Sequence, residues 1–373
     1  MLKFSKAKLK NIDYLLILLA LGCTVFGCVA ISSAVKSYDG GFKFVLIQSI
    51  SALIGLALAW IIASFNFENL SPYTKFIYLI GIFFLLSVLI FGTGREETGS
   101  KSWIRLGPVG IQPSEIVKIG FIITFSKLCE GYGDELNKPK NVLRIILHAA
   151  IILALILLQP DFGTTMVFIV IIAGILFAAG ISYKYIISAF ALIIASVPFV
   201  WHFFLQEYQK NRIRVLLNPE SDPLGTGYHV MQSKIAIGSG GITGKGFGQG
   251  TQTQLGFLPV KHTDFIYSVI GEEFGIIGSV LVALMLFGLV IRCIYVAREA
   301  NSKFGSYICI GVACMFLAHI FENIGMCIGI MPVTGIPLPF FSYGGSSMIA
   351  NMMAIGLVES VAIRKNEIKF NNE

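Results

Sequence analysis

The fold of this chain is decided by residues 262–290, which read HTDFIYSVIGEEFGIIGSVLVALMLFGLV. From Phe265 onward the run is apolar for longer than the roughly 20 residues that a helix needs to cross a bilayer. Backbone polar groups cannot stay unpaired in lipid, so such a run must be helical there. His262, Asp264, Glu272 and Glu273 lie at its beginning, where burial of ionisable groups is costly. The stretch therefore predicts a membrane helix in which the polar side chains of the first turns have a structural or functional role.

The rest of the chain has the same character. Of its 373 residues 55% are apolar and 13% are charged, a composition that a water-soluble domain would not show. Ten apolar runs predict transmembrane helices at 14–32, 44–63, 76–91, 114–128, 143–158, 164–179, 186–204, 265–290, 305–331 and 346–361. The fourth to sixth runs are short, so tilt or extension through polar ends is expected. We therefore predict an all-α polytopic membrane protein forming a single membrane domain over 1–373.

Basic residues predict the orientation, because Lys and Arg accumulate on the cytoplasmic side of short loops. Ten spans place both termini on one side, and both termini are basic. The connections 159–163 and 331–345, on the opposite side, contain no Lys or Arg. We expect both termini to be cytoplasmic. The net charge of +7 then reflects topology and anionic lipid rather than nucleic-acid binding.

Two features of the chain have unremarkable interpretations. The first apolar run is longer than the core of a secretory signal and no small-residue cleavage site follows it, so it is interpreted as a retained helix. Most of the seven cysteines lie within or beside predicted spans, with neither a disulfide framework nor a metal-binding spacing. They are expected to be buried, small apolar side chains.

The largest interruption is the extracellular loop 206–263, between the seventh and eighth spans. It contains an amphipathic stretch at 228–237 and then GSGGITGKGFGQGTQTQLGFLP at 238–259. Loops of this length are usually functional, and this one is expected to pack back over the helices. Its glycines match neither a dinucleotide fingerprint nor a P-loop. Flexible turns and a phosphate cradle that uses Lys234 and Lys245 both remain open.

The topology sends polar residues from distant segments to the outer side of the membrane. They are Trp103, Arg105, Gln112, Glu115, Lys118, Asp161 and Asp264. Each has a structural alternative. Glu115 and Lys118, spaced i and i+3, can neutralise each other, and Asp161 can be a helix N-cap. Buried structural hydrogen bonds are the favoured role for Glu272 and Glu273.

Asp264 stands at the predicted start of the eighth span, where a role as helix N-cap would also explain an aspartate. A cap does not explain the basic, glycine-rich polypeptide before it or the other charges on the same side, so a functional role is favoured. Partial burial would raise the pKa of the Asp264 carboxyl toward the range in which a general base works near neutral pH.

Five segments carry a family resemblance. They are SWIRLGPVGIQPSEIVK (102–118), QPDFGT (159–164), NPESDPLGTGYHVMQSKIAIGSGG (218–241), GKGFGQGTQTQLGFLPVKHTDFIYSVIGEE (244–273) and GIPLPFFSYGGSS (335–347). In this order they resemble the SEDS family of shape, elongation, division and sporulation proteins, and its RodA branch more than its FtsW branch. The turn GIPLPFFSYGG is expected either to contact a partner or to bend within lipid.

The resemblance implies a peptidoglycan glycosyltransferase of the bacterial plasma membrane. Such an enzyme polymerises lipid II, a disaccharide-pentapeptide on undecaprenyl pyrophosphate, for cell-wall elongation and shape. It implies a class B penicillin-binding protein, the crosslinking transpeptidase, as a partner, together with other membrane proteins of the elongation complex. Carried over by position, Asp264 is the catalytic residue. The substrate-binding candidates are Arg105, Glu115, Lys118, Asp161, Arg212, Gln232, Lys245, His262 and Thr263. Val260 stands where the family commonly has an acid, so that acid's role does not transfer.

The expected chemistry is inverting glycosyl transfer. Asp264 takes the proton from a GlcNAc 4-hydroxyl as its oxygen attacks MurNAc C1 of a second lipid II and displaces the lipid pyrophosphate. Cations must meet the charge developing on that leaving group. No tightly bound cofactor is expected and no dedicated metal cage is present, while a role for Mg²⁺ or Mn²⁺ stays open. A lipid II flippase and a non-catalytic scaffold are the alternatives. Charges gathered at the outer face favour the polymerase.

Overall fold

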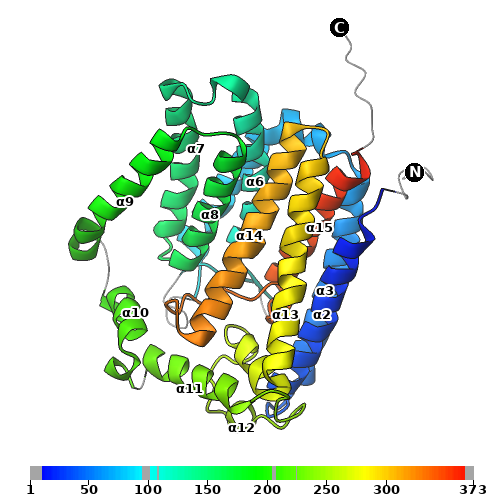
Figure 1. The fold of residues 1–373 in the computed structure, drawn as a ribbon, viewed down its shortest axis with the longest axis vertical. Helices are drawn as coiled ribbons and strands as arrows, with labels where there is room; N and C mark the ends of the chain where they lie inside the picture. The colour runs from blue at the N-terminus through cyan, green and yellow to red at the C-terminus, as the bar shows by residue number, and fades with distance from the viewer. Residues whose placement is uncertain (1–10, 95–100, 107–108, 204–206, 224, 366–373) are drawn as a thin grey trace.

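The computed structural model describes residues 11–94, 101–106, 109–203, 207–223 and 225–365. Ten long helices run through this part of the chain and form one bundle (Figure 1). They are α2 (Tyr14–Ala34), α3 (Phe42–Ser64), α4 (Thr74–Phe91), α6 (Pro113–Tyr132), α7 (Pro139–Leu157), α8 (Phe162–Ala178), α9 (Tyr183–Phe203), α13 (Ile266–Glu299), α14 (Lys303–Ile328) and α15 (Gly345–Ile363).

These helices coincide with the ten predicted runs, so the all-α polytopic fold is confirmed. Eight helical segments are long and apolar enough to cross a membrane by length and composition. Helix α8 is a shorter apolar helix, and α6 carries ionisable residues along its length. The structure extends the eighth span beyond its predicted end at Val290, because α13 continues to Glu299.

Helix boundaries follow local capping chemistry. Helix α2 begins where the Asp13 carboxylate accepts the Leu16 N–H, at 3.0 Å, and α14 begins where Ser302 accepts the Gly305 N–H, at 3.1 Å. Helix α14 ends at Gly329, whose φ of 74° lies in the left-handed region that glycine tolerates. These caps fix where each helix meets its connecting segment.

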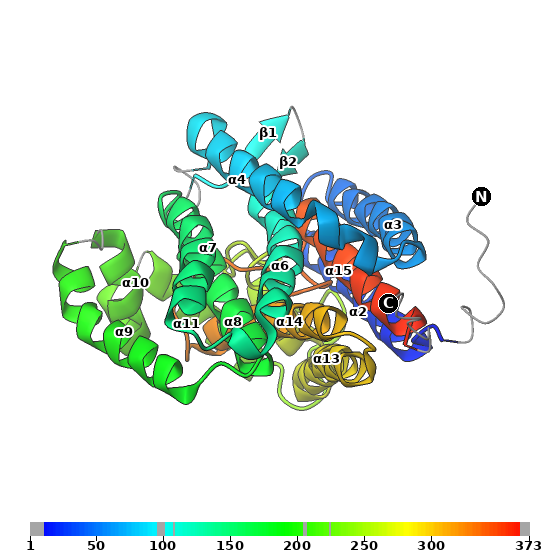
Figure 2. The same cartoon turned by 90° about the horizontal axis from the view of Figure 1, so that it is seen from above.

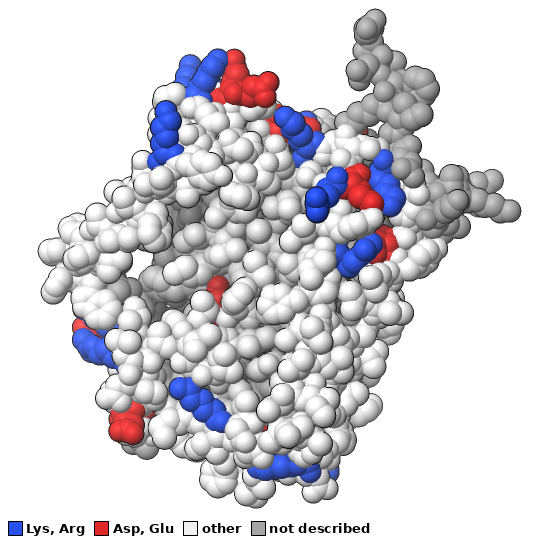
Figure 3. Space-filling model, in the orientation of Figure 1, with Lys and Arg blue, Asp and Glu red and all other residues white. Residues whose placement is uncertain are grey.

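Helix α14 lies at the centre of the packing, in contact with α13, α8, α6, α15 and α11 (Thr226–Ser239). Most of the α14 and α15 side chains are buried. Figure 2 shows α9 at the rim of the bundle, beside α10 (Glu207–Leu217) and away from α2 and α3. The outward surface of the bundle is apolar. In Figure 3 charged side chains gather at the two ends of the face and leave a nearly uncharged band between them, apart from one acidic patch.

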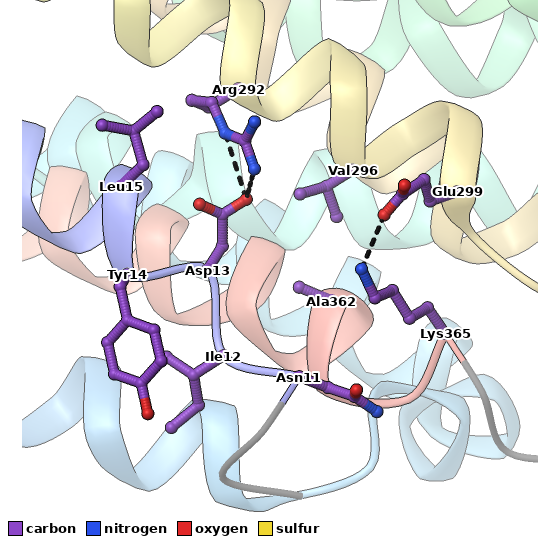
Figure 4. A pocket seen from close by; sticks show the side chains of 10 residues that line it. All are labelled: Asn11, Ile12, Asp13, Tyr14, Leu15, Arg292, Val296, Glu299, Ala362 and Lys365. Atoms are coloured by element: carbon purple, nitrogen blue, oxygen red, sulfur yellow. Dashed lines mark hydrogen bonds and ion pairs between the residues drawn. The ribbon is translucent and has the colours of Figure 1, made fainter.

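One end of the bundle holds both ends of the described chain. The Asn11 side-chain amide donates to Ile363 O, at 3.2 Å, and Arg292 pairs with Asp13. Lys365 pairs with Glu299 at 2.8 Å. These groups line a cavity of about 210 Å³ (Figure 4). The charged side chains that line this cavity pair with one another, and these ion pairs link α13 to the end of α15 and to the start of α2.

The opposite end holds the long connection, which is largely helical rather than structureless. It contains α10, η3 (Pro219–Ser221), α11 and α12 (Thr251–Gln254). The predicted amphipathic stretch lies within α11, which packs on α13 and α14 as expected. A small antiparallel hairpin of β1 (Ile104–Leu106) and β2 (Val109–Ile111) lies between α4 and α6 in the chain and pairs Arg105 with Gly110. The 3-10 helices η1 (Phe67–Tyr73) and η2 (Gly133–Glu135) are short connectors.

Glu272 holds the glycine-rich segment against α13. Its carboxylate, wholly inaccessible to solvent, accepts hydrogen bonds from Gln252 N at 2.8 Å and from Thr253 N at 3.0 Å, and it pairs with Lys245 Nζ at 2.9 Å. The neighbouring Glu273 accepts from Gly248 N, at 3.1 Å. The predicted structural role of both glutamates is confirmed. The engagement of Lys245 with Glu272 favours a packed turn over a phosphate cradle.

Glycine is required where this segment meets α13. At Gly275 the helix is interrupted, with φ 66° and ψ −160°. The freed donors there bind the loop, since Ile276 N donates to Gly241 O at 2.9 Å and Ile277 N to Ile242 O at 3.2 Å. A Cβ at Gly275 would lie 2.4 Å from Gly244 N. The kink in α13 is thus the docking point of the glycine-rich segment.

Candidate functional site

Asp264 lies in the last turn of the long connection, two residues before α13. The helix begins at Ile266 with Phe265 at its N-cap and no side-chain capping bond, so the expectation that Asp264 stands at the cap position is wrong. Asp264 is a half-buried residue. Burial raises the pKa of Asp264 to about 6, while the Thr263 hydroxyl and the Arg212 guanidinium oppose that rise. An aspartate with this pKa is a competent general base near neutral pH.

The chain around Asp264 is held by its backbone. Three consecutive carbonyls accept hydrogen bonds from α14 or from the connection between α14 and α15. His262 O accepts from Tyr343 N at 2.9 Å, Thr263 O from Ser342 Oγ at 2.6 Å, and Asp264 O from Asn323 Nδ2 at 2.8 Å. The position of the carboxyl group is therefore set by residues about 60 to 80 positions away in sequence.

A second polar centre surrounds Lys118 on α6. Its ammonium lies 2.8 Å from Glu115 Oε1 and 2.8 Å from His319 Nε2, and both Glu115 and Lys118 are almost wholly buried. The predicted i, i+3 ion pair is confirmed. An ammonium can only donate, so a charged Lys118 requires Nε2 of His319 to accept and the imidazole proton to sit on Nδ1. The pair thus orients an imidazole from another helix.

The predicted N-cap role of Asp161 is confirmed, and its substrate-binding role stays a prediction. Asp161 is the N-cap of α8, since its carboxylate accepts from Thr164 N at 3.0 Å and from Thr164 Oγ1 at 2.8 Å. It also lies within electrostatic range of Lys118 and Glu115. Burial raises the pKa of Asp161, and the Thr164 hydrogen bonds and the Lys118 charge counteract this. Asp161 therefore belongs to the Lys118 centre.

Glu322 is a member of this centre that the sequence reasoning missed. It lies on α14, its side chain is 6% exposed, and within the described residues neither carboxyl oxygen makes a hydrogen bond of normal geometry. Lys118 and Asp161 lie within its electrostatic range. The available signal was an acidic residue inside the apolar run 305–331, because an ionisable residue at membrane depth is a functional candidate by default.

The connection between α14 and α15 lies between Asp264 and the Lys118 centre. A Cβ at Gly335 would lie 3.5 Å from Asp264 Oδ2, whereas a Cβ at Gly163, next to the Asp161 cap, would lie 3.0 Å from Thr334 Cβ. Residues 334–336 therefore separate Asp264 from the start of α8. Leu338, Phe340 and Phe341 are buried as well. This turn forms a wall of the site, and the expected contact with a partner stays a prediction.

The remaining predicted residues are distributed around these centres. His262 packs its ring against Phe44 and Tyr38, with ring centroids 5.0 and 5.7 Å away, and burial lowers its pKa. Arg212, on α10, acts on Asp264 through its charge. Arg105 lies in β1 and Gln232 in α11, and their substrate-binding roles stay predictions. Lys3, Lys6, Lys8, Lys10 and Lys369, which supported the orientation, lie outside the described residues.

Metal-binding groups were also considered. Within the described ranges no set of three or more His, Cys, Asp or Glu side chains is arranged to hold a metal ion. All seven cysteines are free and are buried or half-buried, which agrees with their interpretation as packing residues.

A helical membrane bundle with a half-buried aspartate at the end opposite its termini and a buried lysine–carboxylate centre places the chain among the polytopic all-α membrane proteins. The profile of the FtsW, RodA and SpoVE family, described as "Cell cycle protein", matches residues 10–367. The chain belongs to this family.

Relatives and solved structures are similar over nearly the whole chain. Peptidoglycan glycosyltransferase MrdB of Escherichia coli K12 is 37% identical over 355 residues, covering 94% of this chain and 93% of that protein. A probable peptidoglycan glycosyltransferase FtsW of Geobacter metallireducens is 34% identical and covers 97% of each. A chain from a peptidoglycan synthase complex that coordinates polymerization and crosslinking superposes with a TM-score of 0.81 at 31% identity, covering 96% of this chain and 99% of that one. The rod shape determining protein RodA of Thermus thermophilus gives 0.72 at 26%, covering 96% and 98%.

Proposed function

We propose that this protein is a peptidoglycan glycosyltransferase that polymerises lipid II at the outer face of the bacterial plasma membrane, with both termini cytoplasmic. One observation carries the proposal. Asp264 lies at the end of the bundle opposite the termini, half-buried, with a pKa of about 6 and a carboxyl group that caps no helix. The names of the similar proteins, all cell-wall polymerases or shape proteins, support the same substrate class.

The proposed reaction needs one base and one leaving group. The Asp264 carboxylate accepts the proton of a GlcNAc 4-hydroxyl while that oxygen forms a bond to MurNAc C1 of a second lipid II. The bond from C1 to the pyrophosphate oxygen breaks, and undecaprenyl pyrophosphate leaves with the electron pair. Attack opposite the leaving group inverts C1 and gives a β-1,4 link. A base with a pKa of about 6 remains ionised at neutral pH and so is ready to accept the proton.

Cationic groups are proposed to meet the charge on the leaving pyrophosphate. Arg212 is the guanidinium whose charge reaches Asp264. Lys118 and Lys245 are less suited, because Glu115 engages the buried Lys118 at 2.8 Å and Glu272 engages Lys245 at 2.9 Å. A divalent cation, Mg²⁺ or Mn²⁺, enters the proposal only as a companion of the substrate pyrophosphate, since the described residues offer no three-ligand cage.

A class B penicillin-binding protein is the proposed partner, with other elongation-complex membrane proteins around it. The support is the likeness to a chain of a synthase complex that coordinates polymerization and crosslinking. Coupling of this kind would place the transpeptidase on the same side of the membrane as Asp264, where the new glycan emerges.

The test uses the purified full-length protein in proteoliposomes with fluorescent lipid II. The wild type is expected to give glycan ladders on a gel, and Asp264→Asn none. Asp39→Asn is the matched control, because Asp39 is an exposed aspartate in the connection between α2 and α3, at the same end of the bundle. Transfer of lipid II between leaflets without ladders would identify a flippase, and neither signal would identify a scaffold. Ladders from Asp264→Asn would reject the base assignment.

A further inference from the structure

The backbone on both sides of Asp264 is held by hydrogen bonds that come from distant parts of the chain. The carbonyls of His262, Thr263 and Asp264 accept in turn from Tyr343 N, Ser342 Oγ and Asn323 Nδ2, at 2.9, 2.6 and 2.8 Å. The segment precedes α13 and follows Val260, whose φ is 47°, so neither a helix nor a strand fixes its direction. These three bonds, all donated from outside the segment, add to the turn bonds that Thr263 N and Phe265 N donate to Val260 O, at 3.2 and 3.4 Å, and fix its direction.

Asn323 commits its whole donor capacity to this arrangement. Its amide has two N–H bonds, and Nδ2 donates to Asp264 O and to Ile336 O, both at 2.8 Å. The side chain is 0% exposed, so loss of the amide would leave Ile336 O without a donor and Asp264 O with only the weak thiol donor of Cys327, at 3.7 Å. A single side chain therefore ties Asp264 to the loop wall that contains Gly335, beside the Asp264 carboxylate.

Ser342 provides the second tie and is itself fixed. Its hydroxyl donates to Thr263 O at 2.6 Å and accepts from Leu338 N at 2.8 Å, which uses its proton and one lone pair. Gln48 on α3 holds the same turn from the other side. Its Nε2 donates to Ser342 O and its Oε1 accepts from Gly344 N, both at 3.1 Å. The turn is thus clamped between α3, α14 and the Asp264 segment.

We propose that Asn323 and Ser342 are positioning residues of the glycosyl transfer reaction, which aim the Asp264 carboxylate at the acceptor hydroxyl by fixing the backbone on both sides of it. This inference rests on the proposed role of Asp264 as the base. A base must lie within hydrogen-bond reach of the proton it removes, and displacement of about 1 Å can lower a rate about 100-fold. Neither residue needs to touch substrate for this effect.

Asn323→Leu tests the first tie, because leucine has nearly the same shape and no donors. We expect kcat for lipid II polymerisation to fall about 10- to 100-fold, with KM changed less than about threefold. Asn351→Leu is the matched control. Asn351 is 1% exposed, and the hydrogen bond of its amide is to Ser347 in its own helix, at 3.4 Å. The control should keep wild-type kcat. Wild-type kcat in Asn323→Leu would overturn the proposal.

Ser342→Thr and Ser342→Val test the second tie even if Asn323→Leu folds poorly. The two variants have the same shape and differ in the hydroxyl, so any steric effect of the extra methyl group is common to both. The proposal expects kcat of the threonine variant to exceed that of the valine variant at least about tenfold, at equal KM. Equal kcat values would contradict it.

Comparison of the two single variants separates failure of this inference from failure of the base assignment. Substantial turnover by Asp264→Asn alone would reject the base itself. Inactive Asp264→Asn together with fully active Asn323→Leu would reject only the positioning role.

Discussion

The Lys118 ammonium lies 2.8 Å from Glu115 Oε1 in a part of the bundle where the two side chains are 0% and 2% exposed. Such a pair has a stronger influence on stability than a surface pair, because neither charge can turn to water when the other is removed.

Removal of one partner should therefore be more harmful than removal of both. We expect Glu115→Gln or Lys118→Met to destabilise the protein by about 3–5 kcal/mol, and the double variant to recover much of that loss. Thermal unfolding in detergent measures it. The double variant should still polymerise poorly, because His319 loses its donor at 2.8 Å. Wild-type ladders from the double variant would show that the pair is purely structural.

The pH dependence of activity should follow Asp264. Since the base acts as a carboxylate and its folded-state pKa is about 6, kcat/KM should be lost as the pH falls through about 6. The contribution of Asp264 to folding stability has the opposite pH dependence. The raised pKa means that folding favours the protonated form, so the contribution of Asp264 to stability is fully present below its ordinary pKa of 3.8 and is lost as the pH rises through about 6. A pH profile of polymerisation with no inflection between about 5 and 7 would contradict the assignment.

Glu322 should limit stability. Its carboxyl is 6% exposed and has no hydrogen bond of normal geometry within the described chain, a situation that costs about 1–3 kcal/mol. We expect Glu322→Met to raise the thermal midpoint. Glu359→Met is the control, because Glu359 is equally buried but accepts the Asp13 N–H at 3.1 Å. A midpoint that drops in Glu322→Met at least as far as in the control would show that Glu322 has a stabilising partner.

The kink in α13 should tolerate no side chain. At Gly275 the φ of 66° and a contact of 2.4 Å from a built Cβ to Gly244 N predict that Gly275→Ala destabilises by more than about 1 kcal/mol. It should also release the glycine-rich segment, detectable as faster amide hydrogen exchange over 240–254. Gly131→Ala, where nothing lies within 4 Å of the added carbon, should be neutral or slightly stabilising. Equal stability of the two variants would show that the kink is not required.

The ten helices could be predicted because each is a local object. A helix in lipid satisfies its own backbone hydrogen bonds, so an apolar run of sufficient length defines it without reference to the rest of the chain. The i, i+3 spacing of Glu115 and Lys118 and the capping chemistry of Asp161 are local in the same sense, and both were foreseen.

The cap expected at Asp264 failed for the opposite reason. The start of α13 depends on where the preceding turn is held, and that turn is fixed by Asn323 and Ser342. Glu322 was missed because a single acid in an apolar run does not reveal its neighbours. Its proximity to Lys118, more than 200 residues earlier in the chain, comes from the packing of α14 against α6.

The sequence by itself determined the membrane fold, the positions of the ten long helices and the residue types available for chemistry, because hydropathy and helical spacing act over one helix at a time. Only the tertiary structure decided that His319 faces Lys118, that the α14–α15 turn walls the site, and that Asp264 is held by its backbone rather than by a cap. Those relationships arise between segments far apart in the chain. They depend on how side chains pack and which hydrogen-bond donors they bring together, and the periodicity of one helix does not reveal this.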